Sequence, residues 1–285
     1  MATRGAGGAG RRGSVFVLTD YGLADEFAGV LRAVVQREAP DASIIDLTHG
    51  VTPFDVRAGA LALMRAVPHL GPGVVLAVVD PSVGTTRRGV AVSVAPATGV
   101  HGPRHFVGPD NGLLPWAVDL LGGADRAVVL APVGEDSVST FDGRDLFAPA
   151  AAQLWQGVPI SDLGEQLDPS TLVRLGAPRL SVAPGVLESE VQWVDRFGNV
   201  QLAARGDDAV ASAIDIDLEV VAAGVHRARR VRAFAELEPG ALGLVVDANG
   251  HLALVCHRHS AATVLQVQSG DVVSLRAIAP GRSAP

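Results

Sequence analysis

Apolar runs of strand length alternate with helical patterns through the first 180 residues. Residues 15–18 and 74–79 are continuous apolar runs rich in β-branched side chains, and a shorter run covers Ile44 and Ile45. Such runs are typical of parallel strands buried on both faces of a sheet. Residues 27–35 carry an apolar helical stripe that ends before Pro40, and residues 56–67 predict a second helix. The order predicts an α/β domain with a largely parallel sheet over residues 14–180.

The pattern changes after residue 180. Short apolar runs separated by turn signals cover residues 186–194, 218–221, 242–246, 252–256 and 263–267. Asn249-Gly250 lies between two of them and favours a hairpin with a type I′ turn, which needs positive φ at both central positions. We therefore expect a small all-β, barrel-like or sandwich domain over residues 186–285, joined to the first by a linker at residues 181–185.

Composition and charge exclude several classes of function. The first 13 residues are rich in glycine and arginine and predict a disordered tail, because the apolar run that follows ends at Asp20, too early for a signal peptide or a membrane span. All 23 basic residues are arginine, which argues against Schiff-base enzymes and Walker A nucleotide sites. The net charge of −7 and the lack of a basic stripe argue against nucleic-acid partners. A single cysteine, Cys256, favours a reducing compartment, with the cytoplasm as the default.

Aspartates follow each predicted parallel strand, at the edge of the sheet where ligands bind in α/β proteins. They are Asp20, Asp46 and Asp80. Asp20 could accept ribose hydroxyls or hold a cation together with Asp25, although Asp25 could instead cap the following helix. Arg87 lies seven residues after Asp80, where the loop could fold its guanidinium onto the carboxylate. That pair would be either a structural clamp or a device that fixes a reactive carboxylate.

Three other polar segments are candidates for chemistry. In residues 139–154, Asp145 is explained as a helix N-terminal charge with Arg144 as its partner, whereas Asp142 has no such structural role. The turn at residues 195–199 is explained by turn-forming residues alone. His257 and His259, two residues apart on one face of a predicted strand, resemble a metal pair, but zinc requires three or four ligands and no third is suitably spaced, so no metal is predicted.

Five ordered strings together resemble one enzyme family. They are TDYGLADEFAG from Thr19, DLTHGVTPFDV from Asp46, VDPSVGTTRR from Val79, FVGPDNGLL from Phe106 with TFDGRDLFAPAAA from Thr140, and DRFGNV from Asp195. The resemblance is to the S-adenosylmethionine hydrolases, or SAM hydroxide adenosyltransferases, which are related to SAM-dependent fluorinases and chlorinases. It extends from about residue 15 to about residue 275.

The resemblance implies an SN2 displacement at the ribose C5′ of S-adenosylmethionine. Water or hydroxide attacks, L-methionine leaves and adenosine forms, with no metal or cofactor. It also implies a homotrimer that holds the nucleoside between the α/β domain of one subunit and the β domain of its neighbour. The substrate contacts it implies are Asp20 with the ribose hydroxyls, Phe54 with the sugar and sulfonium, Asp25 and Asp195 with the methionine ammonium, Asn199 and Phe234 with adenine, and the hairpin residues Ala248 and Asn249 near the methionine carboxylate.

The chain departs from this family at the water-activating set. Asp80 and Arg87 match two members of an Asp-Arg-His set, but the usual Phe-His-Gly-Arg-Asp string has Asp142 in place of its histidine. If both carboxylates face Arg87, their mutual repulsion should raise the pKa of one, which could then take a proton from water. We therefore predict that Asp80, Arg87 and Asp142 form the catalytic set.

Three alternatives differ from the hydrolase in chemistry. A SAM-dependent halogenase would bind a halide, which a carboxylate at Asp80 would repel; those relatives carry an uncharged tyrosine there. A calcium-dependent nucleoside hydrolase would need a denser acidic cluster than Asp20 and Asp25 provide. A catalytically silent binder of S-adenosylmethionine or adenosine is consistent with the missing histidine.

Overall fold

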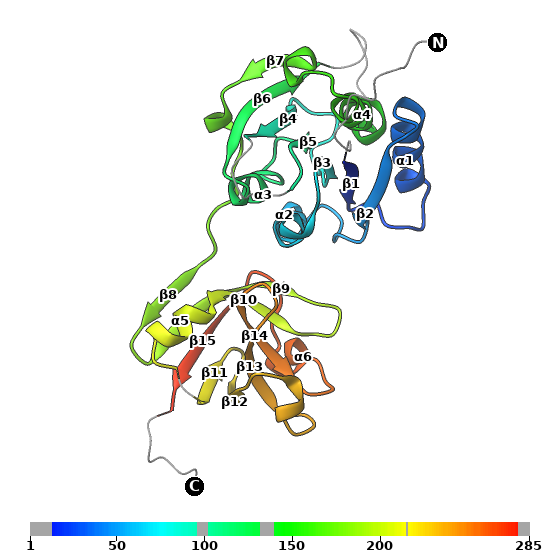
Figure 1. Cartoon of the computed structure of the whole chain (residues 1–285). Helices are drawn as coiled ribbons and strands as arrows, with labels where there is room; N and C mark the ends of the chain where they lie inside the picture. The colour runs from blue at the N-terminus through cyan, green and yellow to red at the C-terminus, as the bar shows by residue number, and fades with distance from the viewer. Residues whose placement is uncertain (1–12, 96–101, 132–139, 215, 279–285) are drawn as a thin grey trace, which may run out of the picture. The chain divides into compact units, whose positions relative to one another are not determined.

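The computed structural model describes residues 13–95, 102–131, 140–214 and 216–278. The chain divides into two compact units, with the division between Leu175 and Gly176 (Figure 1). The predicted tail at residues 1–13 lies, apart from Gly13, outside the described residues.

The first unit contains a seven-stranded sheet with the order β2-β1-β3-β5-β4-β6-β7. Its strands are β1 (Ser14–Thr19), β2 (Ser43–Thr48), β3 (Gly73–Val78), β4 (Gly89–Val94), β5 (His105–Pro109), β6 (Ala124–Leu130) and β7 (Gly164–Leu167). The pairs β2/β1, β1/β3 and β3/β5 are parallel. Strand β4 is antiparallel to β5 and β6, and β7 is antiparallel to β6. Strand β6 therefore runs parallel to β2, β1, β3 and β5. The predicted mostly parallel sheet is confirmed.

Helices and short helical turns pack around this sheet. They are α1 (Phe27–Glu38), α2 (Val56–Ala66), α3 (Pro115–Leu120) and α4 (Ala148–Gln156), with the short helical turns η1 (Val67–His69), η2 (Gly143–Phe147), η3 (Ile160–Asp162) and η4 (Pro169–Thr171). Helices α1 and α4 pack together against one face of β1, where Val15 and Val17 join their core. Phe16 and Leu18 point to the opposite face because side chains alternate along a strand.

Strand β2 differs from its prediction. It is an edge strand with one neighbour, most of its residues are not buried, and Ile45 is 43% exposed. Asp46 lies within β2 rather than at its end, and its carboxylate forms an ion pair with Arg32. The predictions that β2 is buried on both faces and that Asp46 lies at the ligand-binding edge are therefore wrong.

The second unit is a closed β-barrel. Its strands are β8 (Leu180–Ala183), β9 (Val186–Val194), β10 (Val200–Arg205), β11 (Asp217–Val221), β12 (Val225–Arg230), β13 (Leu242–Val246), β14 (His251–Cys256) and β15 (Val272–Ala277). The order is β10-β14-β13-β12-β11-β15-β9-β8, and the pairing of β9 with β10 closes seven strands into a barrel. Leucine and valine side chains fill its interior. The short helices are α5 (Gly206–Ala211), η5 (Phe234–Glu236) and α6 (Ala261–Leu265). The predicted barrel-like domain is confirmed.

Three local predictions for this unit are wrong. Residues 181–185 are not a linker, because they form β8 and its turn into β9. Residues 263–267 overlap helix α6, which Ser260 caps by accepting a hydrogen bond from the Thr263 N–H at 3.1 Å. The hairpin of β13 and β14 is present, but its turn is not type I′: Gly250 has φ 80°, whereas Asn249 is not among the residues with positive φ. The Asp247 carboxylate accepts the Asn249 N–H at 2.8 Å and so holds the turn in another form.

No helix in the described part of the chain is long and apolar enough to span a bilayer.

Candidate active site

A cavity of about 380 Å³ lies beyond the carboxyl ends of β1 and β3 in the first unit. Five residues that the sequence singled out line it, namely Asp20, Asp25, Phe54, Asp80 and Asp142. The cavity also contains aromatic side chains from α1 and from the loop before η2. An acidic and aromatic lining of this kind suits a cationic ligand with an apolar body.

Asp20 follows β1 and holds a strained residue in place. Its Oδ2 accepts the backbone N–H of Phe54 at 2.9 Å. Phe54 has φ 67°, a left-handed conformation that is an outlier for a bulky residue, and its side chain is 72% exposed. The next residue, Asp55, caps α2 by accepting the Ala58 N–H at 2.8 Å. The segment is thus fixed between Asp20 and α2, and Phe54 contributes to the cavity wall.

Asp25 does not cap the helix that follows it. The N-cap position of α1 is Glu26, which makes no side-chain capping hydrogen bond. Asp25 is exposed and lines the cavity, so the structural alternative for this carboxylate is not observed.

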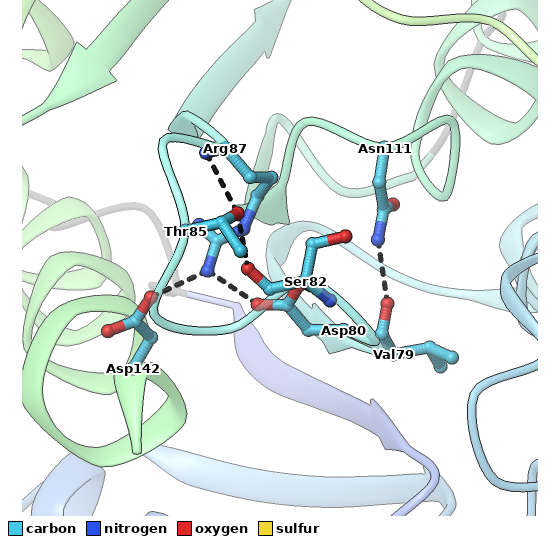
Figure 2. A network of polar contacts seen from close by, with 7 residues as sticks. All are labelled: Val79, Asp80, Ser82, Thr85, Arg87, Asn111 and Asp142. Atoms are coloured by element: carbon cyan, nitrogen blue, oxygen red, sulfur yellow. Dashed lines mark hydrogen bonds and ion pairs between the residues drawn. The ribbon is translucent and has the colours of Figure 1, made fainter. Parts of the chain in front are cut away.

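Asp80 and Asp142 share one guanidinium nitrogen of Arg87 (Figure 2). Arg87 Nη2 lies 2.5 Å from Asp80 Oδ2 and 2.6 Å from Asp142 Oδ2. The Arg87 side chain is 7% exposed, that of Asp80 5% and that of Asp142 18%. The loop between β3 and β4 therefore folds back as its spacing predicts, and it meets a carboxylate from the segment that precedes η2.

Two further contacts fix this group. Asp80 Oδ1 accepts the Ser82 N–H at 3.2 Å, and the Arg87 guanidinium lies 5.4 Å from the centre of the Phe147 ring. Asn111 donates its side-chain N–H to the carbonyl of Val79 at 2.8 Å and so anchors the chain just before Asp80 (Figure 2). The sequence singled out the string that contains Asn111 but gave no role to this side chain.

Burial, more than charge repulsion, sets the protonation of Asp80. Its pKa is raised above the usual range mainly by burial, while Arg87 and the Ser82 N–H lower it and Asp142 raises it by the smallest amount. The sequence predicted that one carboxylate pKa would rise through mutual repulsion, and the direction holds for Asp80. The proposed main cause was wrong, because burial cannot be read from the spacing of charged residues.

Tyr21 is a part of the cavity that sequence reasoning missed. Its pKa is raised well above the usual range, first by burial and then by Asp20, Asp80 and Asp142. The phenol therefore stays protonated beside three carboxylates. The available signal was its position directly after Asp20.

The second unit has its own cavity, of about 480 Å³. Asn199 and Phe234 line it, together with Phe197 and Arg258. The rings of Phe197 and Phe234 are 78% and 46% exposed, so this cavity offers apolar faces and polar groups to a planar ligand.

The remaining predicted contacts of this unit lie in turns. Asp195 Oδ2 accepts the side-chain N–H of Asn199 at 2.7 Å, and Asp195 Oδ1 accepts the Phe197 N–H at 2.8 Å. Asp195 thereby orders the wall that carries Asn199. Ala248 and Asn249 lie in the β13–β14 turn and are not among the residues that line this cavity.

The Arg144/Asp145 and His257/His259 pairs have different outcomes. Arg144 donates to Asp145 at 2.6 and 2.8 Å, as expected. His257 and His259 follow the end of β14 rather than sharing a strand face, and His257 Nδ1 lies 2.5 Å from the carbonyl oxygen of Leu237. Among the described residues, no group of three His, Cys, Asp or Glu side chains is placed to hold a metal ion.

Both units match models of one protein family. Residues 15–164 match the SAM hydroxide adenosyltransferase N-terminal domain, and residues 189–274 match the C-terminal domain of the same family. The chain belongs to the SAM hydroxide adenosyltransferase family.

Relatives of the chain agree with this assignment. An (R)-S-adenosyl-L-methionine hydrolase of Salinispora tropica is 44% identical over 89% of this chain and 94% of its own length. One of the same name from Thermus thermophilus is 37% identical over 92% and 98%. A crystal structure of a conserved Thermotoga maritima protein superposes with a TM-score of 0.82 at 32% identity, covering 92% of this chain and 99% of that one. Three fluorinases match at 25–30% identity.

Proposed function

We propose that this member of the family hydrolyses S-adenosylmethionine to adenosine and L-methionine. The (R)-sulfonium epimer is the proposed substrate, because the hydrolases similar to the chain named above carry that epimer in their names. The observation that carries the proposal is the shared contact of Asp80 and Asp142 with Arg87, beside a cavity that Asp20 also lines.

The charge of the cavity supports a sulfonium substrate. Asp20, Asp25, Asp80 and Asp142 line it, and Arg87 is buried behind the last two. A cationic sulfonium is attracted to this group of carboxylates, and both products lack its positive charge at sulfur. Asp20 supplies an acceptor for the ribose hydroxyls, and Asp25 supplies one for the methionine ammonium.

The reaction is a single displacement at C5′. The oxygen of a water molecule bonds to C5′ while the C5′–S bond breaks and its electron pair stays on sulfur, which becomes the thioether of methionine. One proton of the water passes to a carboxylate and then to solvent. Asp80 is the proposed acceptor, because a raised pKa brings a carboxylate closer to the proton affinity that general-base catalysis needs. Arg87 orients both carboxylates, and Asp142 takes the place of the family histidine.

The same group of charges disfavours a halide as the nucleophile. A halide must lose its hydration before it attacks C5′, and two carboxylates at the attack position would then repel it. Water instead gains two hydrogen-bond acceptors there. This argument favours hydrolysis over halogenation.

We also propose the adenine site and the assembly. The cavity with Asn199, Phe197 and Phe234 suits a purine, which stacks on aromatic rings and bonds an amide. As in the resemblance drawn from the sequence, we propose a cytoplasmic homotrimer in which the neighbour's β-barrel completes the nucleoside site, without a metal or cofactor. Light scattering should give three times the chain mass, and a chelator should leave the rate unchanged.

One experiment tests the reaction. The purified protein is incubated with the separate (R) and (S) epimers of S-adenosylmethionine in ¹⁸O-water, with and without chloride, and products are identified by mass. We expect adenosine carrying one ¹⁸O atom, formed faster from the (R) epimer and absent with an Asp80→Asn variant. Formation of 5′-chloro-5′-deoxyadenosine would indicate a halogenase, and tight adenosine binding without turnover would indicate a silent binder; either result contradicts the proposal.

A further inference from the structure

Tyr21 connects two of the three segments that supply the carboxylates of the cavity. It follows Asp20 at the end of β1, and its ring centre lies 5.6 Å from that of Phe141 at an angle of 72°. Phe27 at the start of α1 lies 6.0 Å from Tyr21 and 5.2 Å from Phe141. Tilted and edge-to-face packing of this kind is favourable and directional. The three rings therefore hold the loop that carries Asp142 against the end of β1.

The hydroxyl of Tyr21 lies directly on the backbone of Gly143. A Cβ built on Gly143 would lie 2.2 Å from Tyr21 Oη, well inside van der Waals contact. Gly143 is not among the residues with positive φ, so the glycine is required by this close approach and not by its backbone conformation. The contact is immediately next to Asp142 in the chain, which places the hydroxyl where it limits the movement of that carboxylate.

The protonation state of the Tyr21 phenol is compatible with this close contact. Tyr21 remains protonated because it is buried and faces Asp20, Asp80 and Asp142. It is thus a neutral donor in a cavity otherwise rich in hydrogen-bond acceptors, and it does not add a charge that would repel the carboxylates.

Building on the proposed function, we infer that Tyr21 is a positioning residue for Asp142, and that its hydroxyl, seated on Gly143, holds the Asp142 carboxylate on Arg87. The ring fixes the loop through Phe141, and the hydroxyl fixes the backbone next to Asp142. Loss of this contact releases Asp142 from Arg87 without removing any group that binds the nucleoside.

A double-mutant cycle tests the inference. Gly143→Ala places a methyl group against the hydroxyl, and we expect kcat to fall about 100-fold, the size of effect that a displacement of about 1 Å in an active site produces. Tyr21→Phe removes only the hydroxyl, and kcat should fall by less than in Gly143→Ala, because the loop loses the contact that limits its movement but no added group pushes it away. The double variant should recover most of the loss toward the Tyr21→Phe value, because the nearest atoms to the new methyl are then Phe141 Cε2 at 3.1 Å and ring carbon Cζ of residue 21 at 3.2 Å, which need shift by only a few tenths of an ångström.

A matched control and two further readouts separate positioning from general damage. Gly29→Ala in α1 adds the same methyl group into open space, so it should leave kcat unchanged. Adenosine affinity should be unaltered in all variants. The acid limb of the kcat/KM profile should move to lower pH in Gly143→Ala, because a displaced Asp142 no longer raises the pKa of Asp80.

Specific results would overturn the inference. They are a double variant as slow as Gly143→Ala, a Tyr21→Phe variant with wild-type kcat, and a Gly143→Ala crystal structure in which Asp142 still contacts Arg87. If the wild-type protein forms no adenosine, the proposed function fails, whereas the crystal structures of the variants still decide whether the Tyr21 hydroxyl positions Asp142. A Gly143→Ala protein that does not fold leaves the Tyr21→Phe kinetics as the deciding test.

Discussion

Replacing Arg87 with methionine should destabilise the first unit strongly. The substitution keeps much of the apolar volume but leaves the Asp80 and Asp142 side chains, 5% and 18% exposed, without their shared cation. Both carboxylate oxygens lie within 2.6 Å of one nitrogen, so they are also close to each other. Removing one partner of a buried ion pair costs about 3–5 kcal/mol. We expect a loss of about 4 kcal/mol in the free energy of unfolding at pH 7.

The loss should depend on pH in a defined direction. Burial already raises the pKa of Asp80, and Arg87 is the main group that lowers it, so the pKa rises further in the variant. A group with a raised pKa in the folded state contributes stability that is complete below its unfolded pKa and is lost as the pH rises through the folded value. The Arg87→Met variant should therefore lose less stability at pH 5 than at pH 7.

Urea unfolding at both pH values measures these effects. Arg174→Met is a suitable control, since Arg174 and its partner Asp119 are 53% and 43% exposed and such pairs contribute less than about 1 kcal/mol. A loss for Arg87→Met no larger than that of the control, or an equal loss at pH 5 and pH 7, would refute the idea that Arg87 compensates two buried charges.

Three further predictions concern the two cavities. Asp142→Asn should lower adenosine production at pH 7 by about 100-fold, because the water loses one of the two carboxylates that position it beside Asp80, with nucleoside binding nearly intact; equal activity would remove Asp142 from the mechanism. The acid limb of kcat/KM should lie above the usual pKa of an aspartate, because the pKa of Asp80 is raised, and should move to lower pH in Asp142→Asn; an unmoved limb would exclude their coupling. Burial raises the pKa of the Cys256 thiol, so it should react slowly with a thiol reagent at pH 8, and more slowly still with saturating adenosine; no protection by adenosine would argue against the purine site.

The elements that the sequence predicts correctly are those whose own residues carry the whole signal. Residues 186–194 and 242–246 match β9 and β13, and the stripe from Phe27 to Val35 lies within α1. Strand β12 (VHRARR) was missed because only one of its residues is buried and the string gives no apolar alternation. Residues 263–267 were misread because a five-residue apolar run fits either a strand or a short helix, and Ser260 as a helix cap was the deciding signal.

The residues of the candidate site differ in the same respect: some are indicated by nearby sequence and others only by contacts between distant segments. Arg87 was found because it lies on the same loop as Asp80, where spacing limits what the side chain can reach. The contact between Tyr21 and Gly143 joins segments far apart in the chain, and a glycine inside a polar string gives no sign that a hydroxyl lies on it. Edge position likewise decided that Asp46 faces Arg32 instead of the cavity, and strand order cannot be derived from the strands alone.

In the proposed mechanism, Asp142 stands where the resemblance implies a histidine, and this difference changes the charge of the site. With a neutral histidine, Asp80 and Arg87 would balance each other, whereas Asp142 leaves the group with a net negative charge on a single arginine nitrogen. That charge faces a cavity that also contains Asp20 and Asp25. It favours a cationic sulfonium and disfavours an anionic nucleophile, and it lets water donate to either carboxylate. The departure from the family pattern therefore strengthens discrimination against halides, provided that Arg87 keeps both side chains oriented.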